Sequence, residues 1–193
     1  MKNYKLMWGG KPNITIPKLF GGGGESLELT TIVVSGSSLE GSSSIQTHGD
    51  MSVGDTVLAA SIEGLPDTDV AAEFLLWEYT GSDISSQITL VTSSIETITT
   101  SSHASYRLIN CENKAEPLKI SHNHPILIKS ESVWLFEYVT DVVDTFKLVS
   151  SSLDEVTITS ITDVTGSPAT GSFRRFDIEP HDTYFADGIL IHN

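Results

Sequence analysis

Two polar residues, His192 and Asn193, close the sequence directly after the apolar stretch "FADGILI". A C-terminus is usually a polar segment that frays. This one is better interpreted as a buried strand that delivers two polar side chains to one place. Asparagine can cut its own peptide bond, because its side-chain amide can attack its own main-chain carbonyl. The sequence therefore predicts peptide-bond chemistry at Asn193, provided that other groups in the chain support it.

Four stretches carry groups that could take part in such chemistry. In the third of them, Ser121 and His124 lie around a turn that ends at Pro125. The second contains Gly54-Asp55, which opens an apolar run. In sequence order the stretches are "SLELTTIVVSG" (26–36), "MSVGDTVLAAS" (51–61), "LKISHNHPILI" (118–128) and "RRFDIEPHDTYFADGILIHN" (174–193).

The elements that must position these groups are short strands. Thr, Ser, Ile and Val dominate, and strand-like runs of 4–8 residues recur between turn signals, several with apolar and polar residues alternating at period 2. Helical periodicity is scarce. Only "LPDTDVAAEFLLWEY" (65–79) could begin with a helical turn, before aromatic and branched residues favour a strand. The pattern predicts an all-β fold.

Composition excludes several classes of protein. A chain of 193 residues is long enough for one domain with a real core. The net charge of −14 argues against nucleic acid and anionic membranes as partners, since both need basic patches. No apolar run approaches the roughly 20 residues that span a bilayer, and the first ten residues lack a signal-peptide core. The single cysteine, Cys111, cannot form an intrachain disulfide, so a structural role and a cytoplasmic location are expected.

Residues 1–25 differ from the rest of the chain. They are basic where the body is acidic, and they contain the tetraglycine run 21–24, which is typical of a flexible linker. This places a boundary between Glu25 and Ser26, with a segment at 1–25 and a domain at 26–193. The polar stretch Leu148–Glu155 is predicted to be a loop between two groups of strands.

The four stretches resemble the conserved blocks of inteins, the self-splicing domains of the Hint (hedgehog–intein) fold. The run from Ser26 to Ile32 is similar to an intein N-terminus, and "VGDTVL" to the usual Gly-Asp-x-Val stretch. The "SHNH" run resembles the Thr-x-x-His motif with serine in place of threonine. "FDIEP" and "HDTYFADGILIHN" are similar to the C-terminal blocks, which close on His-Asn. The resemblance covers residues 26–193. It implies a horseshoe-shaped Hint fold of short twisted strands in two pseudo-twofold halves.

Site residues follow from this resemblance. Splicing would begin with an N–O acyl shift in which the Ser26 hydroxyl attacks the Glu25 carbonyl, so the scissile bond joins these two residues. His124 would protonate the amide nitrogen that leaves, and Ser121 would orient that peptide. The remaining assignments concern the C-terminal blocks. Asp177 would assist acyl transfer, Asn193 would cyclise, His192 would polarise its carbonyl, and either His181 or Asp182 would activate its amide.

The resemblance also bears on partners. It implies a serine-type mini-intein with no cofactor, whose partners are its own flanking segments, the one at 1–25 being the N-extein. A split member of the family would also need a complementary fragment, and the sequence leaves this open. Serine at position 26, where most inteins have cysteine, is a poorer nucleophile and needs more help from the fold. No metal is expected, because His122 and His124 alone supply too few ligands.

Two other interpretations fit parts of the sequence. A hedgehog-type Hint domain cleaves without ligating, but it does not need the terminal His-Asn pair. A non-catalytic β-sandwich that binds a partner would suit the Ser- and Thr-rich strands and the acidic charge, but it gives no reason for "HN" after a buried strand. The order of the motifs along the chain favours splicing over both.

Overall fold

The computed structural model describes residues 27–28, 32–35, 44–47, 49–103, 105–165 and 172–193; for the first three of these ranges it describes the main chain. Ser26, Glu25 and segment 1–25 lie outside the described residues. The strands are β1 Leu27–Glu28, β2 Ile32–Ser35, β3 Ser44–Thr47, β4 Thr56–Ile62, β5 Glu78–Tyr79, β6 Ile88–Ser102, β7 Ser105–Cys111, β8 Leu118–Ile120, β9 Pro125–Ser130, β10 Val133–Tyr138, β11 Lys147–Val149, β12 Glu155–Thr165, β13 Ser172–Glu179, β14 Thr183–Ala186 and β15 Ile189–His192. The short helices are α3 Ala71–Phe74, η2 Ile84–Gln87 and η3 Val139–Asp141.

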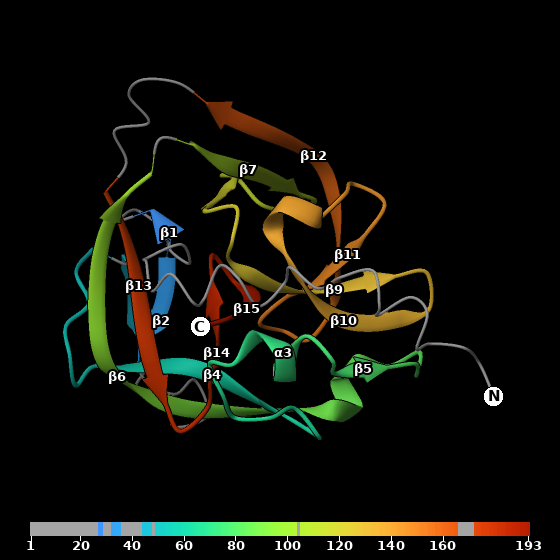
Figure 1. The fold of residues 1–193 in the computed structure, drawn as a ribbon, viewed down its shortest axis with the longest axis horizontal. Helices are drawn as coiled ribbons and strands as arrows, with labels where there is room; N and C mark the ends of the chain where they lie inside the picture. The colour runs from blue at the N-terminus through green and yellow to red at the C-terminus, as the bar shows by residue number, and fades with distance from the viewer. Residues whose placement is uncertain (1–26, 29–31, 36–43, 48, 104, 166–171) are drawn as a thin grey trace.

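The described strands form one curled antiparallel sheet (Figure 1). Its order is β11-β12-β7-β8-β1-β13-β6-β4-β2-β14-β15-β9-β10-β5, with β3 on β2. A further pairing of β11 with β9 brings one end of this order back onto the other. The long strands β6 and β13 run along one side of the molecule, and β14 and β15 lie inside the curve (Figure 1). The predicted all-β fold is therefore confirmed.

Two buried clusters hold the sheet. The larger lies between β4, β7–β9, β12, β13, β14 and β15, and the smaller is built around Phe74, Trp77, Trp134 and Phe136. The alternation of branched residues with Thr and Ser in β12 suits a pleated surface that is covered on one face, whereas β4 is apolar on both faces and contributes to both clusters. Burial of these side chains is the dominant stabilising contribution, at about 25 cal/mol for each Å² of apolar surface removed from water.

The strand order places segments from distant parts of the sequence side by side. Strand β1 lies between β8 and β13, with Leu27 opposite both Ile120 and Arg174. Strand β15 pairs with β14 and with β9, where Ile191 faces Ile126. The main chain next to position 26, the strands around residues 121–124 and the end of β15 therefore belong to one region of the sheet.

Two local expectations differ from the structure. The run "EFLLWEY" is expected from its composition to be a strand, but only Glu78–Tyr79 is one, because α3 and a turn occupy the residues before it. Strand β6 extends through "TSSIETITTSS", well past the 4–8 residues expected, because its β-branched threonines pair with β13 along their length. The loop predicted at 148–155 corresponds to a shorter turn at 150–154, because Leu148 and Val149 belong to β11 and Glu155 to β12. Within the described residues, no helix is long and apolar enough to cross a membrane.

Candidate active site

A tight hairpin carries His192 and Asn193 into the interior. Strands β14 and β15 pair from Ala186↔Ile189 to Thr183↔His192. Asp187 and Gly188 form the two-residue turn with φ of 49° and 69°, the left-handed values that Asp-Gly turns of this length need. Beyond the last pair, the Asn193 main-chain N–H donates to the Asp182 carbonyl at 2.6 Å. Asn193 is therefore held at the buried end of the hairpin, and the sequence-based expectation of a buried strand is confirmed.

The side-chain amide of Asn193 lies against β13. In one orientation its Nδ2 points to Asp177 Oδ1 at 3.4 Å, a long contact. Rotated by 180°, the amide donates to the Phe176 carbonyl and accepts from the Ile178 N–H at 3.1 Å. The second orientation satisfies both donor and acceptor, so we assign it to Asn193. In either orientation the amide lies between the Asp177 carboxylate and the main chain of Phe176 and Ile178.

Asp177 sits where the register of β13 against β6 shifts. It faces Thr97, whereas the next residue, Ile178, faces Ile95, which leaves one extra residue in β6. Bulges of this kind re-aim side chains and recur beside active sites. The Thr97 hydroxyl donates to Asp177 Oδ2 at 3.2 Å, so the carboxylate is held on the side of Asn193.

Asp182 is the buried carboxyl of the site. Burial raises its pKa to about 7, helped by the negative charges of Asp67, Asp69 and Glu179, while a hydrogen bond from Asn193 acts in the opposite direction. A carboxyl with such a pKa can take up or release a proton near neutral pH, as a general acid or base must.

Asp182→Asn should stabilise the protein at pH 8 and have little effect at pH 4. The folded protein holds a proton on Asp182 up to a pH of about 7, whereas the unfolded chain loses it near pH 4. Native stability is therefore lost as pH rises through this window, and the amide avoids that loss. In a Ser26→Ala background, we expect a gain of ~1–2 kcal/mol, or about 2–8 °C in Tm, at pH 8. A Tm difference between the two chains that is the same at pH 4 and pH 8 would contradict the assignment.

His192 is fixed by aromatic side chains. Its ring stacks on Phe74 of α3, with centroids 3.9 Å apart and planes at 22°, and meets the edge of Phe136 at 5.6 Å. Its Nδ1 lies 2.8 Å from the Asn193 carbonyl oxygen. In the tautomer that carries the proton on Nδ1, the ring donates to the carbonyl that Asn193 would attack.

Ser121 and His124 are the buried ends of a turn between β8 and β9. The His124 N–H donates to the Ser121 carbonyl at 3.2 Å, and the Val139 N–H donates to the His124 carbonyl at 2.9 Å. Both side chains are 1% exposed. Ser26 lies outside the described residues, but its neighbour Leu27 faces Ile120, the residue before Ser121. The main chain after position 26 is thus paired directly beside this turn.

Two other histidines named in the sequence analysis, His181 and His122, make different contacts. His181 is half-buried between β13 and β14, and among the described contacts Asn193 bonds to Asp182 and not to His181. His122 does not join His124, because its Nε2 lies 3.1 Å from Asp163 on β12. The two histidines of "HNH" therefore do not form a pair of metal ligands.

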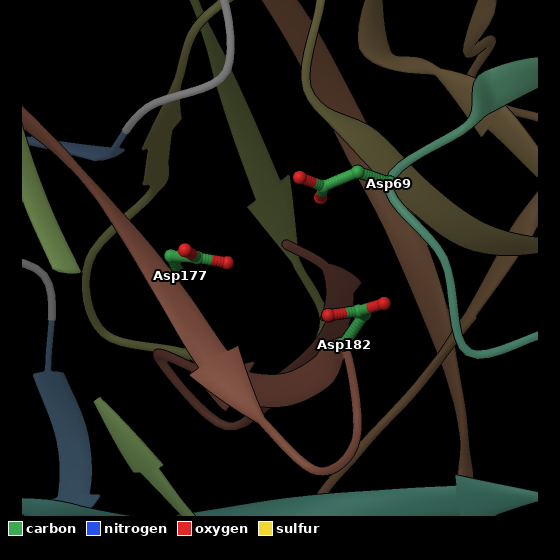
Figure 2. A group of neighbouring side chains, drawn as sticks. All are labelled: Asp69, Asp177 and Asp182. Carbon is green, nitrogen blue, oxygen red and sulfur yellow. The ribbon is translucent and has the colours of Figure 1, made fainter. Parts of the chain in front are cut away.

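Three carboxyl groups meet at the site, as Figure 2 shows. Asp69, Asp177 and Asp182 each place an oxygen within 4.8 Å of the others. Asp69 comes from the loop before α3 and is held by Arg175 of β13 through a 3.0 Å ion pair. Three carboxylates could hold a hydrated cation. Burial raises the pKa of Asp182 to about 7, however, so near neutral pH the cluster retains a proton and we interpret it as a group of interacting acids.

Three residues of this region carry no sequence signal of their role. Asp69, Phe74 and Thr97 belong to no motif, and each reaches the site from an element that is distant in sequence. The helical turn expected near residue 71 was the only signal that pointed to Phe74. Nothing local distinguishes Asp69 from other loop acids, or Thr97 from the many threonines of β6.

The fold is similar to solved inteins over most of the chain. An intein-like domain from Clostridium thermocellum aligns with a TM-score of 0.62 at 11% identity, covering 87% of this chain and 98% of that one. The gp41-1 intein aligns with a TM-score of 0.58 at 15% identity, covering 89% of this chain and 100% of that one. A DnaB intein from Synechocystis sp. PCC 6803 aligns with a TM-score of 0.58 at 10% identity, covering 87% of this chain and 97% of that one. No protein-family model and no curated protein matches the sequence. The chain has the Hint fold that these inteins share.

Proposed function

We propose that this protein is a self-processing domain that performs protein splicing, acting on peptide bonds at Ser26 and Asn193. One observation carries the proposal. The strand register brings the main chain at Leu27, the turn with buried Ser121 and His124, and Asn193 into one region of a Hint fold. Amide chemistry at two ends of a chain needs such an arrangement, and holding reacting groups in place can lower a barrier by about 7–11 kcal/mol.

The first step is an N–O acyl shift. The Ser26 Oγ attacks the Glu25 carbonyl carbon, the Glu25–Ser26 C–N bond breaks, and an ester forms while the nitrogen becomes an amine. His124 supplies the proton that the nitrogen needs, the proton lost by the Ser26 hydroxyl replaces it on the imidazole, and Ser121 hydrogen-bonds the same peptide. The burial of both side chains supports these roles, because buried donors are shielded from competition with water.

The last step is cyclisation of Asn193. Its amide nitrogen attacks its own carbonyl carbon, loses a proton to Asp182, and forms a succinimide as the bond to the following residue breaks. That residue's nitrogen takes up a proton and leaves as an amine. His192 donates to the carbonyl oxygen as negative charge develops there, which its 2.8 Å contact supports. The contacts of Asn193 favour Asp182 over His181 as the base.

Between these steps, the acyl group passes from Ser26 to a hydroxyl or thiol on the residue after Asn193. Asp177 assists this transfer, since it lies on β13, which pairs with β1 and contacts Asn193. The flanking segments, including residues 1–25, are the partners of the reaction. Nucleic acid and membranes have no part in it. A complementary fragment would be a partner only if the chain were divided.

The rival functions lose support. The Hint fold replaces the β-sandwich on which a binding module would rest. Hedgehog-type cleavage without ligation needs no asparagine, whereas this chain buries Asn193 and surrounds it with donors and acceptors. That construction favours a domain that uses Asn193 in a reaction.

The proposal is tested by extending the chain. A tail that begins with serine is added after Asn193, the protein is expressed, and the products are weighed by mass spectrometry. We expect a free domain of residues 26–193 and a product in which residues 1–25 are joined to the tail. An intact chain at every pH and temperature at which circular dichroism shows it folded would refute splicing.

A further inference from the structure

We propose that Asp69 is a positioning residue of this site: its carboxylate, anchored by Arg175, controls the proton held by Asp182 and so sets the pH range in which Asn193 cyclises. This inference rests on the proposed function. Asp69 belongs to none of the motifs on which that function was based.

Geometry places Asp69 in the site. Its carboxylate, Asp177 and Asp182 come within 4.8 Å of one another, although they derive from the loop before α3, from β13 and from the segment before β14. Figure 2 shows the three side chains facing a common space. The reacting residue lies against the same group, since Asn193 contacts both Asp177 and Asp182.

Arg175 explains why Asp69 stays there. The loop acid is exposed, and alone it would turn toward water. Its Oδ1 instead bonds the Arg175 guanidinium at 3.0 Å, two positions before Asp177 on the same strand and therefore on the same face. The ion pair is partly exposed and contributes little to stability, but it fixes the position of one negative charge beside the buried acid.

The charges around Asp182 are mostly negative. Asp67 and Asp69 face it from the loop, and Asp177 and Glu179 from β13. Arg175 is the cation shown to pair with this cluster among the described residues, and it pairs with Asp69. His192 and His181 are the nearby groups that could add positive charge when protonated. Carboxylates this close cannot all ionise easily, so the buried one keeps a proton to higher pH.

A base that keeps its proton cannot accept another. Asp182 must be ionised to take the proton from the Asn193 amide, so cyclisation should rise with pH through the midpoint of Asp182. Removing the Asp69 charge makes ionisation easier and moves that midpoint down. The change affects only the protonation of the base, because Asp69 does not contact the bond that breaks.

The experiment measures tail release between pH 5 and pH 9. Every chain carries Ser26→Ala, which blocks the first step, and a tail beginning with alanine. We expect Asp69→Asn to lower the midpoint by about one pH unit, so release is about fivefold faster at pH 6 and unchanged at pH 8.5. Arg175→Gln should raise the midpoint, because it removes a positive charge from the cluster. Asp69→Glu should restore the original profile, and Asp141→Asn, which removes one charge from η3, should leave it unmoved.

Two measurements, tail release and an NMR titration, distinguish failure of the splicing proposal from failure of the Asp69 proposal. Carbon NMR of Asp182 in the Asn193→Ala chain follows its titration without cyclisation, and Asp69→Asn should lower that midpoint too. If NMR midpoints shift but no chain releases its tail, splicing fails and the charge effect stands. If tails are released with the same profile in Asp69→Asn, the role of Asp69 is refuted. A dependence on Asp69 that vanishes in EDTA would assign the cluster to a bound cation and would equally refute it.

Discussion

Asn193→Ala is expected to abolish release of a segment fused after residue 193. Alanine has no nucleophile to attack the carbonyl, and the peptide bond then breaks only at the rate of background hydrolysis. In a chain with a serine-initiated tail, the tail should stay attached over days, whereas the parent chain releases it. The measurement is intact mass together with gel densitometry over time.

The variant should still form the ester at Ser26, since Asn193 takes no part in that step. Hydroxylamine, which cleaves esters, should therefore release residues 1–25 from Asn193→Ala. The loss of a buried amide leaves the Phe176 carbonyl and the Ile178 N–H without their partner, at a cost of about 1–3 kcal/mol, so folding is checked by circular dichroism. Asn110→Ala, which removes an exposed amide bonded to Ser160, is the matched control. Tail release at the parent rate by Asn193→Ala would overturn the assigned role.

His124→Ala is expected to slow cleavage at Ser26 by roughly 10²–10³-fold, the range for loss of a general acid. The amide nitrogen at Ser26 is a poor leaving group unless it receives a proton, and the serine hydroxyl gives less driving force than a thiol would. The measurement is hydroxylamine-induced release of residues 1–25, in an Asn193→Ala background that isolates the first step.

His103→Ala provides the control for that prediction. His103 lies in the connection between β6 and β7, where it bonds Ser101 and meets the edge of Phe173. Its removal should leave cleavage at Ser26 within about twofold of the parent, as expected of a residue outside the site. Equal rates for the parent and His124→Ala would show that the buried histidine is structural only.

The fold followed from local patterns, because strand formation depends on them. Alternating Thr, Ile and Val fit a pleated, half-buried surface, and this was enough to predict an all-β chain. The lengths of the strands were harder to predict. Strand β6 continues through a Ser- and Thr-rich stretch that is polar enough to suggest a loop, and only its pairing with β13 stabilises it as a strand.

The site was predictable where chemistry and sequence order coincide. Asn193 and His192 are recognisable as a polar pair after an apolar run, and the structure buries both. The choice between His181 and Asp182 as the base could not be predicted from the sequence, because it depends on which side chain the hairpin turns inward. The role of Asp69 also could not be predicted from the sequence, since it comes from an ion pair with a strand more than a hundred positions away.

The position of β13, β14 and β15 in the sheet affects when the chain could react during synthesis. Each of these strands pairs with partners that precede it in sequence: β13 with β1 and β6, β14 with β2 and β4, and β15 with β9. While the ribosome is still translating the earlier strands, β1 lacks its neighbour β13, and the carboxyl cluster does not yet exist. If position 26 reacts as proposed, the nascent chain would be protected from premature cutting there until the strands that carry Asp177 and Asn193 have emerged and inserted.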